Sequence, residues 1–292
     1  AEKTITVDDL LISSAFLYEL DETLAHYDLR SEVSRKIGYA LAQKYDRLVF
    51  RSLVRGARVA SPITKTGFVE PGGTQIKVGT AASTAASDAY DPTKLVNAFY
   101  DAAAAMDEKG ISTDGRFGVL NPRQYYELIQ QVGENGLVNR DSQGSSRQKG
   151  NGIVEIAGIK IYKSMNIPFF GSYGTKYGTA GATNPGVTDP GNTGTFVSET
   201  IEDAEETDTG INNDYGANTN FVNTCGIIGQ REGAGIVEAI GPQVQVTKGD
   251  VSVIYQGDVI LGRLACGADY VNPAACVELY AGVATSSAPA AF

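Results

Sequence analysis

Residues 28–54, DLRSEVSRKIGYALAQKYDRLVFRSLV, form the longest helical pattern in the chain. Asp28 or Ser31 can cap its N-terminus, and Gly56 supplies a stop beyond its end. Roughly 24 helical residues at ~1.5 Å each give a helix on the order of 36 Å long. One side is apolar at helical spacing, through Val33, Ile37, Ala40, Leu41 and Leu48. Because the opposite side is polar, we expect the helix to pack along one side only, against a sheet.

The segment before this helix has the alternation of a strand. In residues 3–12, KTITVDDLLI, Ile5 and Val7 alternate with threonines, which predicts a strand with two differently solvated faces. Residues 14–27 are apolar without a regular period, and we expect an irregular amphipathic connector there.

Two further helices have clear start signals. Asp91 and Pro92 begin one that ends at Gly110, and Asn121-Pro122 begins another after a short strand at 117–120. The expected apolar faces are Leu95, Ala98, Phe99, Ala102, Ala103 and Met106 in the first, and Tyr125, Leu128, Ile129 and Val132 in the second. Later strands are expected at 153–163 (hinged at Gly158), 243–247, 258–271 and 274–282.

Two stretches predict long loops. Residues 133–152 are rich in Gly, Ser, Asn and charge, and residues 171–220 combine many Gly, Thr and Asn with an acidic run at 199–208. Clustered carboxylates suit hard cations, so weak metal candidates in that run are Glu202, Asp203, Glu205 and Glu206. The run lacks EF-hand spacing, and a solvated acidic loop is the favoured interpretation.

Composition excludes several functional classes. The 292 residues carry 34 Asp plus Glu against 24 Lys plus Arg, a net charge of −10, which argues against a dedicated nucleic-acid binder. A single histidine, His26, excludes a multi-His metal site within one chain, and we interpret it as structural. Three cysteines do not make a disulfide framework, and Cys266 and Cys276 are expected to be buried. No apolar run reaches the ~18–20 residues of a membrane span.

Catalytic and phosphate-binding motifs are not found. The sequence contains no P-loop, CxxC, HExxH or Gly-x-Ser-x-Gly pattern, so we predict a protein that is not an enzyme and needs no cofactor. No signal peptide is visible, and because the sequence opens with Ala1 inside an apparent strand we expect a further N-terminal piece. The basic residues Arg51, Arg55, Arg58 and Lys65 could contact DNA or an acidic partner, but a polar surface with intersubunit ion pairs is favoured.

Several strings resemble a known family. EKTITVDDLL (2–11) and HYDLRSE (26–32), with the helix continuing through Asp46, resemble the major capsid proteins of tailed bacteriophages, closest to the T7-like podovirus branch, which includes cyanophages. VLNPRQYYELI (119–129), GIKIYKSMNIP (158–168) and GDVILGRLACGADYVNPAACVEL (257–279) resemble later landmarks of that family. The resemblance covers about 1–55 and 91–282, and the long stretch 171–220 departs from its pattern.

The resemblance implies an α+β Hong Kong 97 type capsid fold. Residues 1–12 would be the return strand of an extended loop over a neighbouring subunit. Residues 13–90 and 243–270 would form a peripheral domain with a spine helix at 28–55. Residues 91–242 and 271–292 would form a mixed α/β axial domain that includes the insertion 171–220. The loop at the capsomer centre would contain Asn139, Arg140, Asp141 and Arg147.

The function implied is structural. Copies would assemble into pentamers and hexamers of an icosahedral head around double-stranded DNA, with a scaffolding protein during assembly and a portal at one vertex. The protein would be part of the virion, assembled in the host bacterial cytoplasm, with DNA against its inner face without sequence specificity and no membrane partner. Assembly and core residues would be Ile5, Val7, Val33, Ile37, Leu41 and Leu48.

Three alternatives stay open from the sequence. An encapsulin-like compartment shell would share the fold and enclose an enzyme cargo. An acidic Gly/Thr-rich surface or adhesin protein would be monomeric, with calcium bound by 199–208. A hydrolase would have to use His26.

Overall fold

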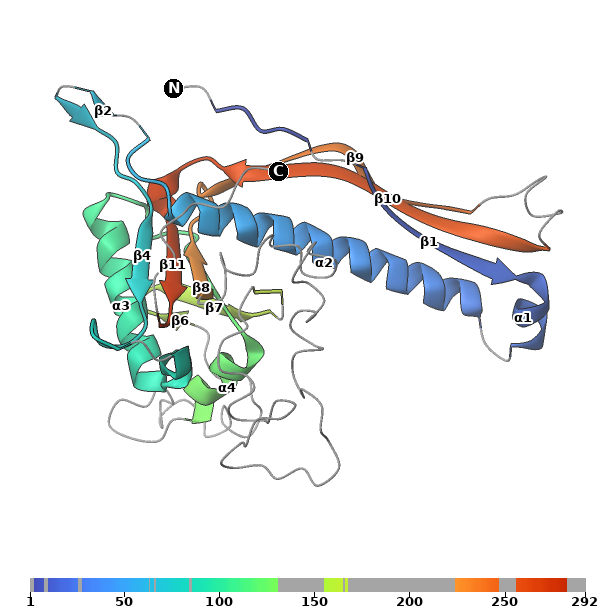
Figure 1. Ribbon diagram of the computed structural model, residues 1–292, viewed down its shortest axis with the longest axis horizontal. Coiled ribbons are helices and arrows are strands. Elements are labelled where there is room, and N and C mark those ends of the chain that lie inside the picture. The colour runs from blue at the N-terminus through green and yellow to red at the C-terminus, as the bar shows by residue number, and fades with distance from the viewer. Residues whose placement is uncertain are drawn as a thin grey trace. The chain divides into compact units, whose positions relative to one another are not determined.

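The computed structural model describes residues 3–7, 10–25, 28–62, 64–65, 67–83, 86–130, 155–164, 166–167, 224–246 and 256–282 (Figure 1). The chain divides into two compact units. We call Phe50–Ala234 with Tyr270–Ala291 the larger unit, and Glu2–Val49 with Gly235–Asp269 the smaller unit.

The smaller unit is a three-stranded sheet with one long helix on one face (Figure 1). The strand order is β1-β10-β9, and β1 pairs antiparallel with β10 from Leu11↔Leu264 to Tyr18↔Gly257. Its elements are β1 (Leu11–Tyr18), α1 (Glu19–Leu24), the first part of α2 (Leu29–Ala57), β9 (Ala234–Val246) and β10 (Gly257–Tyr270). The buried core between α2 and β10 consists of Ile37, Leu41, Leu48, Ile260, Leu264 and Cys266. The long helix expected from the sequence therefore packs through its apolar side, except that Ala40, which we expected there, is exposed.

The first strand lies later in the chain than the sequence predicted. Strand β1 begins at Leu11, residues 3–7 are in no strand, and a short helix replaces the expected connector at 19–24. Residues 3–7 nevertheless lie along the far end of β10: Lys3 pairs with Asp269 at 2.7 Å, and a side chain on Gly267 would collide with the Thr6 carbonyl. Ile5 is half-buried and Val7 is 41% exposed, so neither lies in the core of the isolated chain.

The larger unit contains a six-stranded sheet of order β4-β11-β8-β5-β7-β6. Strand β11 runs parallel to β4 and β5 parallel to β7, while β8 is antiparallel to both β11 and β5, and β6 is antiparallel to β7. The strands are β4 (Thr74–Lys77), β5 (Phe117–Leu120), β6 (Glu155–Ile156), β7 (Ile159–Lys163), β8 (Thr224–Gly229) and β11 (Cys276–Tyr280). The other elements are β2 (Thr64–Lys65), β3 (Phe68–Val69), η1 (Ala86–Tyr90), α3 (Pro92–Glu108), α4 (Pro122–Gln130) and η3 (Pro273–Ala275).

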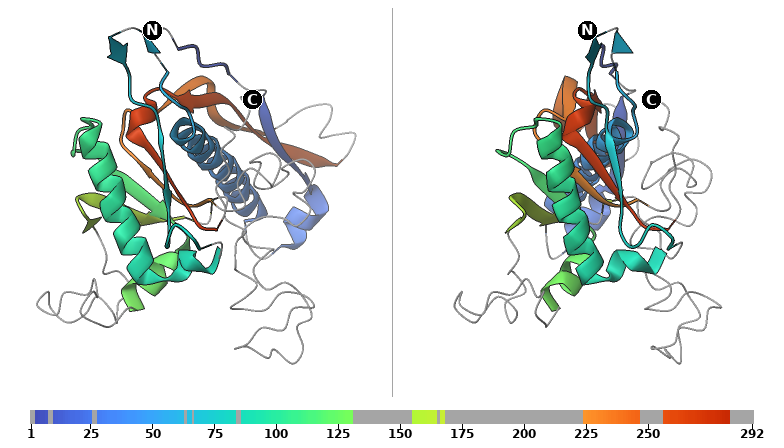
Figure 2. Two further views of the ribbon diagram at one scale, coloured as in Figure 1. Left: turned by 60° about the vertical axis from the view of Figure 1, so that its left-hand side comes forward. Right: turned by 90° about the vertical axis from the view of Figure 1, so that its left-hand side faces the viewer.

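Helix α3 confirms its sequence prediction in detail. The Asp91 carboxylate accepts hydrogen bonds from the backbone amides of Thr93 and Lys94, with Pro92 at the first helical position. The buried side chains are Leu95, Ala98, Phe99, Ala102, Ala103 and Met106, and they pack with α4 and the sheet in one apolar cluster. Figure 2 shows the helix α3 lying alongside this sheet. In α4, Gln124 reaches back and accepts a hydrogen bond from the Asn121 amide at 3.1 Å, which closes the first turn.

The C-terminal strands differ slightly from expectation. Strand β9 extends from 234 rather than 243, and residues 273–275 form a short 3-10 turn before β11. The expected hinge at Gly158 separates β6 from β7, as predicted. Cys225, Cys266 and Cys276 are all buried free thiols, which confirms the expectation for Cys266 and Cys276. Within the described ranges, no helix is both long and apolar enough to cross a membrane.

Candidate functional site

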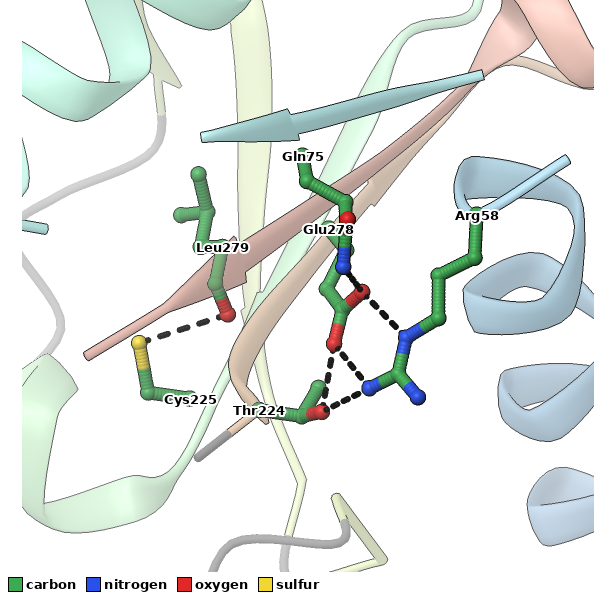
Figure 3. Close-up of polar contacts among 6 residues, drawn as sticks. All are labelled: Arg58, Gln75, Thr224, Cys225, Glu278 and Leu279. Atoms are coloured by element: carbon green, nitrogen blue, oxygen red, sulfur yellow. Dashed lines mark hydrogen bonds and ion pairs between the residues drawn. The ribbon is translucent and has the colours of Figure 1, made fainter. Parts of the chain in front are cut away.

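A closed polar cluster lies inside the larger unit, centred on Glu278 of β11 (Figure 3). The Arg58 guanidinium donates to both carboxylate oxygens, Nε to Oε2 at 2.7 Å and Nη2 to Oε1 at 2.6 Å. Thr224 of β8 donates to Oε1 at 2.6 Å, and Gln75 of β4 donates to Oε2 at 2.9 Å. Each carboxylate oxygen thus accepts two hydrogen bonds, and the Arg58 and Glu278 side chains are each 1% exposed.

This cluster is structural rather than catalytic in its geometry. Both oxygens of Glu278 are occupied by donors of the same chain, so no oxygen faces open solvent to take a proton from a substrate. A buried ion pair is stable only when such extra hydrogen bonds offset the loss of hydration. The cluster therefore joins the end of α2 to the strands β4, β8 and β11.

The basic residues near the end of α2 correct a sequence expectation. We expected Arg51, Arg55, Arg58 and Lys65 to form an exposed polar surface, or a contact to DNA. Instead Arg58 is in the buried ion pair, Arg51 is buried, and Arg55 lies 5.5 Å from the centre of the Tyr270 ring. The side chain of Lys65 lies outside the described set. Arg58 is buried because the end of α2 belongs to the larger unit, where Glu278 supplies its countercharge.

A second internal contact fixes the turn before β4. Lys109, at the end of α3, donates to the carbonyls of Gly72 at 2.6 Å and Gly73 at 3.0 Å, and also contacts the Thr74 hydroxyl. Burial lowers the pKa of this ammonium. Burial also raises the pKa of the Cys225 thiol, and that of Cys276 to about 12, so both remain protonated and unreactive at neutral pH.

The smaller unit has its own ionic contact at the start of α2. Arg30 pairs with Glu22 of α1 at 2.6 Å and with Asp258 of β10 at 2.7 Å. The hydrogen bond to Glu22 raises the pKa of Arg30. This contact holds α1, α2 and β10 together at one end of the smaller unit.

The outer face of β1 exposes three large apolar side chains around Ser14. Along this strand half-buried and exposed residues alternate, so Leu11, Ala15 and Leu17 face the α2 core while the other row faces outward. That outward row contains Ile12, which is 58% exposed, with Phe16 and Tyr18, whose rings meet edge to face at 4.8 Å. In α1, Leu20 and Leu24 are each 68% exposed. A strand that is apolar on both faces is typical of one that another chain covers.

An apolar groove lies between α2 and β9 in the smaller unit. Its cavity volume is about 370 Å³. Its wall on α2 includes Gly38, Leu41 and Ala42, its wall on β9 includes Pro242 and Val244, and Leu264 of β10 also lines it. The charged residues that line it, Asp46 and Glu238, are both acidic. The Tyr45 hydroxyl donates a hydrogen bond to the Glu238 carboxylate. Burial, and to a smaller extent this hydrogen bond, raises the pKa of Tyr45.

Of the other residues predicted from the sequence, some lie in or against the α2 core and the rest lie outside the described residues. Ile37, Leu41 and Leu48 are in the α2 core, and Val33 is half-buried against it. The loop residues Asn139, Arg140, Asp141 and Arg147, the acidic residues Glu202, Asp203, Glu205 and Glu206, and His26 all lie outside the described residues. In the part that is described, no group of three or more His, Cys, Asp or Glu side chains could hold a metal ion.

Comparisons with known proteins point in one direction. The family model described as "Gp10A-like: Major capsid protein" matches residues 1–198, about two thirds of the chain. The major capsid protein of Escherichia phage T7 is 28% identical over 130 residues, which cover 44% of this chain and 37% of that protein. The minor capsid protein of the same phage is also 28% identical over 130 residues, 44% of this chain and 32% of its own length. The match thus spans about a third of these curated relatives.

Solved capsid structures share the fold. The capsid structure of the cyanophage P-SCSP1u matches with a TM-score of 0.67 and 29% identity, over 96% of this chain and 74% of that one. The mature capsid of bacteriophage PhiM1 matches with a TM-score of 0.58 and 15% identity, over 96% of this chain and 73% of that one, which concerns the fold alone. These likenesses confirm the expected α+β Hong Kong 97 type fold. With the family match over most of its length, the chain belongs to the Gp10A-like major capsid protein family.

Proposed function

We propose that this chain is the structural subunit of an icosahedral phage head, in which copies form pentamers and hexamers around double-stranded DNA. The observation that carries the proposal is the likeness to a cyanophage capsid subunit over 96% of the chain at 29% identity. Rings of this kind form by heterologous contacts that close under rotational symmetry. Many modest contacts then hold one shell, because each subunit joins several neighbours.

The exposed apolar row on β1 supports this proposal. The α2 core does not include Ile12, Phe16 or Tyr18, and these apolar side chains are exposed to solvent. A neighbouring subunit that covers this row would remove apolar area from water, at about 25 cal/mol per Å². We therefore place an intersubunit contact on the outer face of β1.

The remaining parts of the proposal concern partners and place. We propose a scaffolding protein during assembly, a portal at one vertex, assembly in the host bacterial cytoplasm, and a final location in the virion. The net charge of −10 supports a wall that does not adhere to phosphate and lets DNA slide without sequence specificity. We also propose that the chain has no enzymatic activity, because its family is one of capsid proteins and the buried carboxylate of Glu278 already accepts hydrogen bonds from its own neighbours.

The assignment of domains is part of the same proposal. The smaller unit would be most of the peripheral domain and the larger unit the axial domain, with residues 13–90 and 243–270 against 91–242 and 271–292 as first boundaries. The observed division places Phe50 onward with the larger unit, which moves the end of α2 across that boundary. The loop 133–152 would lie near the capsomer centre, and residues 1–12 would be the return strand of an extended loop that lies over a neighbouring subunit. The role of 171–220 is not assigned.

The test uses one substitution on the outer face of β1 and one matched control. Ile12→Thr removes apolar surface from β1, whereas Val271→Thr does so at a residue of similar exposure, 51%, in the larger unit. Electron microscopy and sedimentation of the full-length protein, expressed with its scaffolding protein, should show icosahedral shells for the unaltered chain and for Val271→Thr. The Ile12→Thr protein should give at least about a tenfold lower shell yield, with its free energy of unfolding changed by less than about 1 kcal/mol. Shells at full yield from Ile12→Thr would refute the contact, and a chain that never assembles would refute the function itself.

A further inference from the structure

We propose that the groove between α2 and β9 is a docking site for a basic amphipathic helix of a separate protein. The inference stands apart from the proposed function, because it concerns a surface of the single chain. It begins from Gly38, which lies in the interior of α2 and lines the groove. Glycine inside a helix is less stable than alanine, so its presence needs a reason.

No contact with another described residue explains why position 38 is a glycine. Outside its own stretch of helix, no described atom lies within 4 Å of the position that a Cβ on Gly38 would take. Gly262 of β10 is the contrast, since a Cβ there would lie 2.3 Å from the Ile37 side chain. Gly262 therefore serves the packing of α2 on its own sheet, whereas Gly38 leaves room for something that approaches α2 from outside.

The shape of the groove fits a helix. Gly38 and Ala42 are one turn apart on the same side of α2, so the backbone of a second helix can come close there. The groove follows α2 from Gly38 to Asp46, about 12 Å at ~1.5 Å per residue. Anchors at positions i, i+4 and i+7 of an incoming helix span about the same length. The apolar side chains that would receive them are Leu41, Pro242, Val244 and Leu264.

Charge indicates which helix would fit. The two charged residues of the lining, Asp46 and Glu238, are both acidic and both exposed. They favour a partner with lysine or arginine beside its apolar stripe. A second copy of this chain fits poorly, because the exposed apolar pair on its own α1, Leu20 and Leu24, is flanked by acidic residues with no basic residue in the last turn. Two copies of the groove would also face each other concave to concave.

The experiment measures binding of a synthetic 18-residue Leu/Lys amphipathic peptide to the full-length chain by fluorescence anisotropy. A Leu/Glu peptide of the same pattern is the charge control. We expect saturable binding of the Leu/Lys peptide alone, weakened by salt because charges contribute to it. Gly38→Leu and Ala42→Arg fill the groove and should each raise the Kd at least about tenfold. Ala104→Arg, at an exposed alanine of α3, is the matched control and should leave the Kd unchanged.

A further variant separates binding from folding. Gly38→Ala should raise the Tm of the chain by about 2–4 °C, because alanine is the better helix former, and yet weaken peptide binding. Binding that ignores Gly38→Leu and Ala42→Arg, equal binding of the Leu/Glu peptide, or no saturation at about 1 mM peptide would each overturn the proposal. Sedimentation in which the unaltered chain forms pairs that Gly38→Leu dissociates would overturn it in favour of a second copy as the occupant.

Discussion

The described residues of the two units differ in which polar groups they bury and which apolar side chains they leave exposed. In the larger unit, α3 and α4 cover the sheet, and the buried Glu278 has four hydrogen bonds from its own chain. In the smaller unit, one helix covers one face of a three-stranded sheet, and the outward row of β1 is left apolar in water. The larger unit completes its own interior, whereas the smaller unit has apolar surface that it does not cover.

This difference indicates where stability and where assembly reside. Buried polar groups with all partners inside one unit specify that unit without help from outside. We expect the apolar row on β1 and the groove between α2 and β9 to gain binding free energy when another chain covers them. The comparison therefore predicts that substitutions in the larger unit change folding, and that those on the open surfaces of the smaller unit change association.

The largest expected effect comes from the small core of the smaller unit. Leu41→Asp places a charge without a partner between α2 and β10, beside Ile260 and Leu264. We expect the free energy of unfolding of the smaller unit to fall by about 4–6 kcal/mol, the cost of a lost leucine plus a buried charge. Hydrogen exchange should show lost protection in β1 and β10 with β5 and β11 still protected, and shells should not form.

Ala40→Asp is the matched control for this substitution, because Ala40 is exposed on the same helix. It should retain protection in all four strands. If Leu41→Asp assembled at normal yield, the assignment of α2's buried side would be wrong. If it removed protection from β5 and β11 equally, the two units would fold as one, and the comparison would fail.

An effect nearly as large is expected in the larger unit. Glu278→Ala leaves the Arg58 guanidinium buried without its countercharge, and we expect the free energy of unfolding to fall by about 3–5 kcal/mol in urea titrations. The double variant Arg58→Met, Glu278→Leu removes both charges. Its loss of unfolding free energy should therefore be smaller than the sum of the losses measured for Arg58→Met and Glu278→Leu singly. Additive losses would show that the pair is not coupled.

The corresponding pair in the smaller unit sharpens this contrast. The Arg30 and Glu22 side chains are both about a third exposed, and solvent screens their attraction. Glu22→Gln, which leaves the Arg30–Asp258 ion pair in place, should therefore cost less than about 1 kcal/mol in the same urea titration. A loss as large as that of Glu278→Ala would mean that the smaller unit also depends on a closed ionic cluster.

Local signals explain what the sequence could predict. The Asp91-Pro92 start and the six-residue apolar stripe of α3 lie within one helix, so neighbouring residues contain the whole pattern. Strand β1 was misplaced because it is apolar on both faces, and the alternation that marks a half-buried strand is therefore lost. Under the proposed function its outer row contacts a neighbouring subunit, and no period within a single chain can reveal such a contact.

The buried ion pair shows a second limit. Arg58 resembles a surface arginine beside other basic residues, and its partner Glu278 is 220 positions away in the chain. Only the packing of β11 between β4 and β8 brings the carboxylate to the end of α2. The one local hint is Glu278 itself, a single charged residue in the apolar run of β11.

The smallest expected effect is on the pH dependence of the unfolding free energy, through Asp88 just before α3 in the larger unit. The Asp88 carboxylate accepts a hydrogen bond from the Lys94 ammonium at 2.8 Å, and this bond, with one from Ser83, holds the pKa of Asp88 below its usual range. A lowered pKa in the folded state adds stability above the unfolded value of about 3.9, and this stability is lost as the pH falls through the folded value. Because Lys94 is about a third exposed, solvent reduces the contribution to less than about 1 kcal/mol.

Asp88→Asn should therefore lower the free energy of unfolding slightly at pH 7, and the difference from the unaltered chain should narrow as the pH falls below about 4. Urea titrations at pH 7 and at pH values below 4 measure this, with Asp101→Asn, at an exposed carboxylate of α3, as the control. A difference that stays constant with pH would mean that Asp88 acts through its shape and hydrogen bonds rather than its charge. The start of α3 would then depend on neutral hydrogen bonds and packing at Asp88 rather than on its charge, in contrast to the buried charge of Glu278.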